Sequence, residues 1–404
     1  MPLLSEVCEA IVDCEHKTAP TAPEGFPSIR TTDIKRGRLD LFRANKVDAE
    51  TYRAWSRRLE PRPRDIILAR EAPVGEVGII PEGARVCLGQ RTVLIRPDTR
   101  SVDPHYLLYL LMSDAVRHEM LVKSNGATVA HLNLRDIRAL RLPDLPPIRE
   151  QTQVARTLAV LDERVSVAEE MNRTLEAMAR ALFKSWFVDF DPVRAKMEGR
   201  PTGLPPEVDA LFPDRLVDSP IGVVPAGWLV GVLEDLLVLQ RGFDLPATAR
   251  IQGTVPILSA GGRTGTHNEA RVRGPGVVTG RSGQLGKVFL VQEDFWPLNT
   301  TLWVKEFKAS RPHHAFHVLS GIDFNVFNSG SAVPTLNRNH VHNLPQIVPP
   351  VKVVETFESA VGPFYERVRH NERETQTLSE MRDLLLGKLL SGEVRVSPEQ
   401  AAEV

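Results

Sequence analysis

The hydrophobic pattern alternates between two kinds of segment along the chain. Short apolar runs separated by Gly and Pro, which are typical of β-strands, fill two stretches. The runs are Asp65-Ile-Ile-Leu-Ala69, Val77-Gly-Ile-Ile80 and Thr92-Val-Leu-Ile-Arg96, then Gly276-Val-Val-Thr279, Lys287-Val-Phe-Leu-Val291 and Thr301-Leu-Trp-Val304. A helical patch follows each group, at residues 104–120 and 312–319. We therefore expect two modules of mixed strands and helices.

A long amphipathic segment follows each module after a double proline, at Pro146-Pro147 and Pro349-Pro350. Apolar residues recur at spacings of four and three, which predicts a coiled-coil seam. The seam positions are Val154, Leu158, Leu161, Val165, Ala168, Leu175, Ala179, Leu182 and Trp186, then Phe357, Val361, Phe364, Val368, Leu378, Leu385 and Leu389. About 40 residues give a rod ~60 Å long. Each helix could pack on its own sheet, but this length favours pairing of the two helices.

The two halves of the chain repeat each other at an offset of about 203 residues. Gly126-Ala-Thr-Val-Ala-His-Leu-Asn133 returns as Gly330-Ser-Ala-Val-Pro-Thr-Leu-Asn337. Arg70 upstream matches Arg281 at a slightly longer offset, and Asn172 and Asn371 interrupt the two seams. Several matches in one order indicate a duplicated fold. A buried Asn in each seam could fix the register of the helices.

These patterns predict an α+β protein: two similar mixed modules separated by two long antiparallel coiled-coil helices, with an internal pseudo-twofold repeat. We expect the following divisions: module 1 at 1–145, a spacer helix at 146–190, a connector at 191–219, module 2 at 220–348, a second spacer helix at 349–391 and a tail at 392–404.

The net charge of −1, from 50 basic and 51 acidic residues, hides an alternation along the chain. The two modules carry +2 and +3, whereas residues 146–219 and 349–404 each carry −3. Module 1 has 18 Arg against 4 Lys, which suits bidentate contacts to guanine and phosphate. A high-GC genome would also favour Arg codons, so this preference has two interpretations. Charge acts through local patches, so a neutral total does not exclude nucleic-acid binding.

Patterns that suggest catalysis or metal binding have simpler interpretations here. Residues 280–287 resemble a phosphate loop, but the glycine spacing is one residue too long, and a tight hairpin is favoured. His313, His314 and His317 have helical spacing, and we expect surface histidines rather than metal ligands. Three cysteines without paired spacing argue for a reducing compartment. No export signal or membrane span is visible, so we expect a cytoplasmic binder that is not an enzyme.

The segment between the modules carries a family resemblance. Leu182-Phe-Lys-Ser-Trp-Phe-Val-Asp-Phe-Asp-Pro-Val-Arg194, then Leu211-Phe-Pro-Asp214 and Pro225-Ala-Gly-Trp228, resembles the central region of type I restriction–modification specificity subunits. The duplicated layout extends the resemblance over nearly the whole chain. The resemblance implies that the modules are two DNA target recognition domains, each followed by a spacer helix.

The resemblance also implies partners. Two methyltransferase subunits would dock on the helices and clamp double-stranded DNA, and restriction (motor–nuclease) subunits would join for cleavage. S-adenosylmethionine, ATP and magnesium would then bind those partners, and we expect this chain to bind no cofactor or metal. The target would be asymmetric and in two parts, with an unread spacer, although its sequence and length cannot be predicted.

Base reading requires polar loops that reach the major groove. The candidates for DNA contact are Arg30, Thr31, Thr32, Lys35, Arg36, Arg70 and Arg91 in module 1, and Arg241, Ser259, Arg263, Thr264, His267, Arg281, Ser282 and Gln284 in module 2. Each could instead be ordinary solvated surface. The alternative function is a non-catalytic scaffold that joins two protein-binding modules on a coiled-coil rod. Retention of DNA by the purified assembly, lost at high salt, would separate the two.

Overall fold

The chain folds into two units that interleave along the sequence. A computed structural model describes residues 1–124, 130–327 and 335–395. Unit 1 comprises Met1–Val167 and Glu374–Val404, whereas unit 2 comprises Ala168–Arg373. Unit 1 thus joins module 1 to the first half of one long helix and the last half of the other. Unit 2 joins module 2 to the remaining halves.

Each module is built on a four-stranded antiparallel sheet. In module 1 the order is β1-β9-β6-β7, with β1 at Cys8–Asp13, β9 at Thr92–Pro97, β6 at Ile66–Ala69 and β7 at Val77–Ile79. In module 2 the order is β13-β19-β16-β17, with β13 at Leu237–Arg241, β19 at Thr301–Phe307, β16 at Gly276–Gly280 and β17 at Val288–Val291. The two sheets have the same topology.

A second, three-stranded sheet is also repeated. Module 1 has the order β5-β2-β8, with β5 at Asn45–Val47, β2 at Phe26–Ile29 and β8 at Cys87–Leu88. Module 2 has the order β15-β14-β18, with β15 at Gly262–His267, β14 at Val255–Ser259 and β18 at Trp296–Pro297. In both, the central strand pairs antiparallel on one side and parallel on the other. The sequence repeat is therefore a repeat of topology, which confirms the predicted fold class.

Within the described part of the chain, the remaining strands form three two-stranded ribbons. They are β3 (Ile34–Lys35) with β4 (Arg38–Leu39), β10 (Leu216–Ser219) with β11 (Gly222–Pro225), and β12 (Leu229–Val232) with β20 (Pro345–Val348). β16 and β17 form an antiparallel pair with Thr279 opposite Val288, so the residues between them close a hairpin, as the sequence predicts, and not a phosphate loop.

Both units also contain short helices. Unit 1 contains α1 (Ala49–Trp55), α2 (Pro104–Met112), α3 (Asp114–Lys123) and α4 (Leu134–Arg138), and unit 2 contains α6 (Asp191–Met197), α7 (Pro206–Asp209), α8 (Leu233–Leu236), α9 (Pro312–Ser320) and α10 (Arg338–His342). α2 and α9 are counterparts, because each begins with Pro after the four-stranded sheet is complete. Proline fits this place because the first helical N–H has no intrahelical acceptor.

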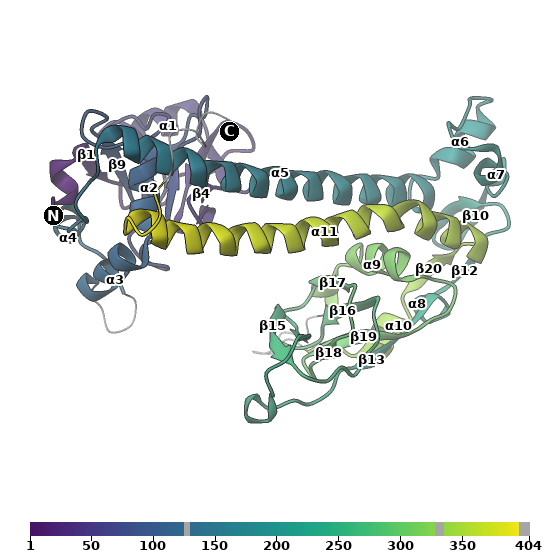
Figure 1. The fold of residues 1–404 in the computed structure, drawn as a ribbon. Coiled ribbons are helices and arrows are strands. Elements are labelled where there is room, and N and C mark those ends of the chain that lie inside the picture. Colours follow the sequence, from purple (N-terminus) through teal and green to yellow (C-terminus); the bar gives the residue numbers. More distant parts are fainter. Residues whose placement is uncertain (125–129, 328–334, 396–404) are drawn as a thin grey trace. The chain divides into compact units, whose positions relative to one another are not determined.

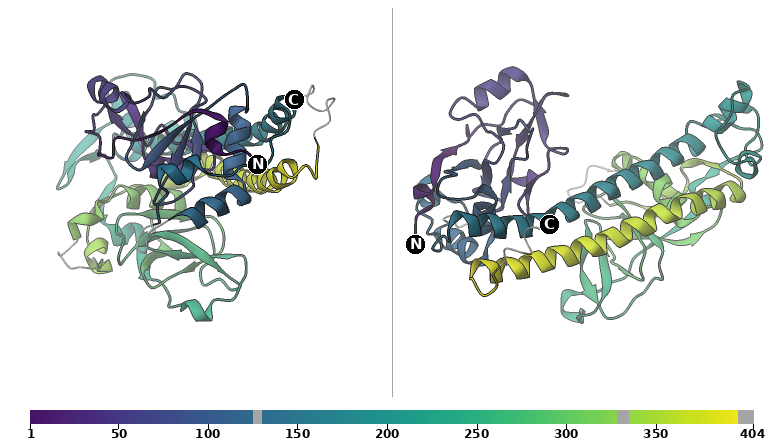
Figure 2. Two further views of the ribbon diagram at one scale, coloured as in Figure 1. Left: turned by 90° about the vertical axis from the view of Figure 1, so that its left-hand side faces the viewer. Right: turned by 45° about the horizontal axis from the view of Figure 1, so that its top comes forward.

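The long helices are α5 (Ile148–Phe187) and α11 (Val351–Leu390), each 40 residues long. Within each unit they run antiparallel and side by side (Figures 1 and 2). In unit 1, Leu158 of α5 and Leu386 of α11 share the core of module 1. In unit 2, Phe187 packs edge-on against Phe357 at 5.3 Å. The helices therefore pair with each other and also seat the modules.

The two seam asparagines meet in unit 2. The Asn371 amide, 1% exposed, donates to Oδ1 of Asn172 at 2.7 Å. A polar pair inside an apolar seam costs stability but disfavours other registers, because any shift would bury each amide without a partner.

None of the described helices is long and apolar enough to cross a membrane.

The expectation that the histidines of α9 lie on the surface is wrong. His313, His314 and His317 are 8%, 2% and 6% exposed. α9 packs on both long helices, and the ring of His317 stacks on Phe183 of α5 at 5.0 Å. Because burial disfavours the charged imidazole, it lowers the pKa of His314 to about 3 and that of His317 to about 4.

Candidate functional site

Three loops of module 2 meet at one end of its sheets. They are the β14–β15 turn, the loop after β16 and the segment before β19. The Ala260 N–H donates to Oγ1 of Thr300 at 3.3 Å, and the N–H groups of Arg281 and Ser282 donate to the Thr300 carbonyl at 2.8 and 3.1 Å. We call this area loop surface 2: Arg241, Asp244, Ser259, Arg281, Ser282, Gln284, Asn299 and Thr300.

Arg281 is anchored by its backbone at the centre of loop surface 2. Its carbonyl accepts from the Leu336 N–H at 2.8 Å, and its guanidinium donates one bond, 3.2 Å long, to the Asn299 carbonyl. Among the described residues, no carboxylate pairs with this guanidinium. A fixed arginine with unpaired charge is well suited to bind an acceptor outside the protein.

Other polar groups extend the surface on both sides of Arg281. Arg241 lies 3.6 Å from Asp244, which also accepts from the Asn299 side chain. The Ser259 hydroxyl donates to the Gly262 carbonyl at 2.9 Å and closes the turn. The Gln284 side chain is exposed and lies beside that turn. A Cβ placed on Gly261 would lie 3.2 Å from Oε1 of Gln284.

Three further candidates of module 2 lie on β15. Arg263 and Thr264 are exposed, and Arg263 lies 3.9 Å from Glu293. His267 is only 5% exposed, and its Nδ1 accepts from the Ile251 N–H at 3.1 Å. Its ring also packs against Trp296. His267 is thus occupied within the fold, whereas Arg263 and Thr264 face solvent.

Module 1 repeats the same backbone frame. The Arg70 carbonyl accepts from the Leu132 N–H at 2.8 Å, as that of Arg281 accepts from Leu336. The Arg70 N–H donates to the Arg91 carbonyl at 3.0 Å, as that of Arg281 donates to Thr300. We call the corresponding area loop surface 1: Asp13, His16, Arg30, Thr31, Thr32, Arg70, Gln90 and Arg91.

The side chains on loop surface 1 are more strongly paired. Arg70 donates to the Asp13 carboxylate at 2.6 Å, with both side chains 12–13% exposed. Arg91 pairs with Glu71 at 3.3 Å and remains exposed. Asp13, Cys14 and His16 could offer metal ligands within 4.8 Å of one another. The guanidinium of Arg70 already supplies the cation beside Asp13, which disfavours a metal there.

The early loop of module 1 is partly self-contained. Asp33 accepts from the Arg30 N–H at 2.9 Å and from its guanidinium at 3.3 Å. Thr31 is 7% exposed and donates to the Ala72 carbonyl, whereas Thr32 is exposed. Arg30 and Thr32 are therefore the members of this loop that face solvent.

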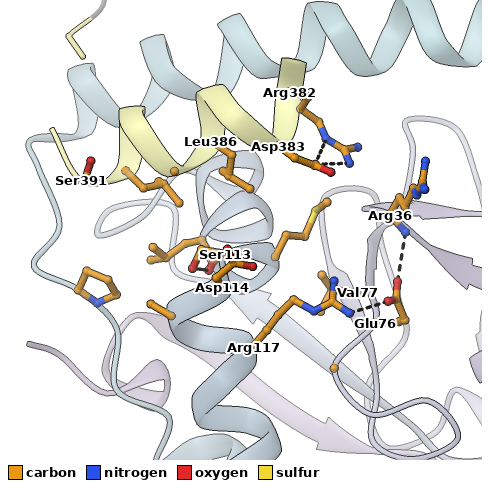
Figure 3. A pocket seen from close by; sticks show the side chains of 17 residues that line it. Arg36, Glu76, Val77, Ser113, Asp114, Arg117, Arg382, Asp383, Leu386 and Ser391 are labelled. Carbon is orange, nitrogen blue, oxygen red and sulfur yellow. Dashed lines mark hydrogen bonds and ion pairs between the residues drawn. The ribbon is translucent and has the colours of Figure 1, made fainter. Parts of the chain in front are cut away.

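The structure does not bring Arg36 together with these residues. Lys35 and Arg36 lie on the exposed β3–β4 hairpin, where the Arg36 N–H donates to Glu76. Arg36 lines a cavity of about 600 Å³ with Arg117 and Leu386, the latter from the last turns of α11 (Figure 3). Glu76 also accepts from Arg117 at 2.9 Å, so one carboxylate holds both arginines at this cavity.

Sequence reasoning missed several members of the two surfaces, notably Asp244, Asn299 and Thr300. Arg91 was identified, and in the repeat its counterpart is Thr300, because both carbonyls accept from the matched arginines. Aligning the halves on the parallel strands β8 and β18 would have found this pair. Insertions of different length between strands obscured that register.

Comparisons with known proteins give consistent matches. A family described as the type I restriction modification DNA specificity domain matches residues 17–177. The MjaIX specificity subunit of Methanocaldococcus jannaschii is 24% identical over 82% of this chain and 78% of its own length. The HindI specificity subunit of Haemophilus influenzae is 25% identical, covering 75% of this chain and 80% of its own. The crystal structure of a type I specificity subunit from M. genitalium matches with a TM-score of 0.57 and 16% identity, over 96% of this chain and 95% of that one.

Proposed function

We propose that this chain, which belongs to the type I restriction–modification specificity subunit family, reads an asymmetric two-part DNA target for its partner enzymes. It acts as the recognition subunit and not as a catalyst. One observation carries the proposal: two copies of the same backbone frame present different polar side chains. The repeated backbone frame gives two DNA-recognition surfaces, and their different side chains would recognise two different half-sites.

The chemistry of the two surfaces fits base reading. Arginine donates two parallel bonds to guanine O6 and N7, and Gln or Asn does the same for adenine. Loop surface 2 offers Arg281 and Gln284, and loop surface 1 offers Arg30 and Arg91. Phosphate contacts from exposed arginines such as Arg263 would position the modules without reading sequence. The DNA contacts that we propose are the members of the sequence-derived set that face solvent on the two loop surfaces, and Arg281 is the best anchored of them. His267 and Thr31 are buried and Arg70 is paired with Asp13, so we expect these three to support the surfaces rather than to touch bases.

The long helices serve the proposal in two ways. Each helix is 40 residues long, with Pro363 inside α11, and the pair would set the number of unread base pairs between half-sites. They also offer a surface on which two methyltransferase subunits and the restriction subunits would dock. Weak net charge in each module predicts weak DNA binding without those partners.

Cofactors would belong to the partners in this scheme. S-adenosylmethionine, ATP and magnesium would bind the methyltransferase and restriction subunits, and none would bind this chain. We place the complex in the cytoplasm, where its DNA lies. Three free cysteines, two of them buried, are compatible with a reducing compartment.

Methylation-aware sequencing of the host genome, with and without this gene, tests the proposal. We expect one bipartite motif with two unlike halves to lose methylation on deletion. The complex with methyltransferase subunits should then bind that motif at least 10³-fold better than unrelated DNA. Unchanged genomic methylation, or equal binding to both DNAs, would reject DNA recognition and favour the scaffold function.

A further inference from the structure

Each module is seated on the paired helices through polar contacts at corresponding positions of the repeat. The helices α5 and α11 begin 203 residues apart, at Ile148 and Val351, and α2 and α9 begin 208 residues apart, at Pro104 and Pro312. These two offsets identify which contact in unit 1 corresponds to which contact in unit 2. We call the contacts seat 1 and seat 2.

The first contact lies at the start of α2 and α9. In seat 1, the Thr152 hydroxyl of α5 donates to the Asp103 carboxylate at 3.2 Å. Seat 2 has Glu355 and Arg311 at the corresponding positions, and the Arg311 guanidinium donates to Glu355 at 2.7 Å. The module thus contributes an anion in seat 1 and a cation in seat 2.

The N-terminal cap of the short helix also differs between the seats in which side of the contact supplies the carboxylate. In seat 1, Asp103 of the module itself accepts from the N–H groups of His105 and Tyr106 at 2.9 and 3.1 Å. In seat 2, the capping carboxylate comes from α11: Glu358 accepts from the N–H groups of His313 and His314 at 3.1 and 3.3 Å.

The second contact lies one and a half turns further along the short helix. In seat 1, the hydroxyl of Tyr109 donates to Asp162 at 2.7 Å, and Arg382 donates to the other oxygen of Asp162, also at 2.7 Å. Tyr109 and Arg382 are 1% and 2% exposed. Both oxygens of Asp162 are used, and Arg382 donates in addition to Asp383, which is exposed at the edge of the network.

Seat 2 fills the same positions with neutral groups. His317 replaces Tyr109, and Tyr365 replaces Asp162, with 2.9 Å between Nε2 and the phenol oxygen. Ala179, fully buried, stands where seat 1 has Arg382. The ring of His313 stacks on Tyr365 at 4.5 Å and completes the contact.

We propose that the two seats are mutually exclusive, so that each end of the helix pair accepts only its own recognition module. Module 1 on seat 2 would set Asp103 against Glu355 and Glu358, a repulsion between like charges in a partly buried site. Module 2 on seat 1 would give Arg311 no carboxylate partner at Thr152. The residues that position the modules, rather than those that touch DNA, then set the spacing at which the two half-sites are read. This deepens the proposed function and rests on it only for the DNA part.

An exchange of residues in the full-length chain tests the proposal. The helix set (Thr152→Glu, Asp162→Tyr, Arg382→Ala) gives α5 and α11 the residues of seat 2, and the module set (Asp103→Arg, Tyr109→His) gives α2 the residues of α9. Glu163→Tyr, at an exposed neighbour of Asp162, is the matched control.

Hydrogen exchange of the α2 amides is the first measurement, with the α9 amides as the internal reference. We expect each set alone to speed α2 exchange at least tenfold, and the two sets together to recover at least half of that change on a logarithmic scale. Additive effects of the two sets would overturn the proposal, because they would mean independent packing contacts. If the helix set unfolds the chain, Thr152→Glu with and without Asp103→Arg carries the same test with one charge pair.

DNA binding by the complex with methyltransferase subunits is the second measurement. The helix set should reduce the preference for the native spacer over a spacer changed by one base pair at least fivefold, and Glu163→Tyr should leave it unchanged. An unaltered preference beside faster α2 exchange would reject the link to half-site spacing. Because the exchange measurement needs no DNA, failure of the proposed function leaves the test of the seats intact.

Discussion

Replacement of Arg281 by alanine is the sharpest test of the reading surface. The backbone of Arg281 is held at both ends by 2.8 Å hydrogen bonds to Thr300 and Leu336, so the loop should keep its shape. The side chain makes one bond, to the Asn299 carbonyl, which is partly exposed and can bind water instead. The change therefore removes a DNA contact with little cost to folding.

The expected magnitude follows from that geometry. A guanidinium with its remaining donors free can form a bidentate pair with guanine, worth about 1–3 kcal/mol of discrimination. This corresponds to a loss of roughly 5- to 150-fold in affinity for the target. Arg281→Lys keeps the charge but loses the planar fork, and should lose most of the same discrimination. Lys287→Ala, at an exposed cation of the same loop, is the control.

Fluorescence anisotropy of the assembled complex on labelled DNA, at several salt concentrations, measures the effect. We expect Arg281→Ala to weaken binding to the target and to spare binding to unrelated DNA. Equal weakening on both DNAs, with a salt slope smaller by about one, would make Arg281 a phosphate contact. No change on either DNA would refute the argument that an anchored, unpaired arginine marks the reading surface.

Three further changes test the framework. Asp65→Ala should destabilise module 1 by about 3–5 kcal/mol, because it leaves the buried Arg96 without its bidentate partner. Adding Arg96→Met should recover most of this loss, and urea unfolding measures both effects. Acid should lower the free energy of unfolding of unit 2, because the pKa values of His314 and His317 lie below the ordinary 6.5. The contribution of these neutral histidines to stability is full above about pH 7 and declines as pH falls through 6.5 toward 4. The loss is roughly 2 kcal/mol per group at pH 5. Exchange of α9 amides at pH 7 and 5 measures this, and His317→Gln should flatten the dependence. Asn371→Val should cost about 1–3 kcal/mol in thermal unfolding because it leaves Oδ1 of Asn172 without its donor, and a stabilised protein would contradict this.

Periodicity and repetition were enough to predict the architecture. The seam from Val154 to Trp186 requires a helix, and its repetition near Phe357 requires a partner of the same length. The strands were visible because runs such as Ile66–Ala69 are buried on both faces and read as continuous apolar stretches. These features depend on local sequence, which a single chain reveals.

The detailed surfaces could not be predicted because they depend on which loops meet. Asn299 and Thr300 have no distinctive local pattern, and they gain meaning only when β18 pairs parallel with β14 and brings them beside Arg281. The prediction that the α9 histidines are exposed was wrong for the same reason. A polar helix face is expected to be solvated, and only the fold shows that two long helices cover it. Arg70 shows the opposite effect: the sequence predicts a free arginine, and the fold supplies Asp13 as its partner.

The interleaving of the two units has a consequence for synthesis on the ribosome. The core of module 1 contains Leu386 and Leu389 beside Leu158, so the packing of the first module needs residues that are translated after the whole of module 2. Unit 2, in contrast, is continuous from Ala168 to Arg373 and can close before the end of α11 emerges. A nascent chain would thus expose an unfinished first module during the whole translation of the second, which makes that interval the period of greatest need for a chaperone.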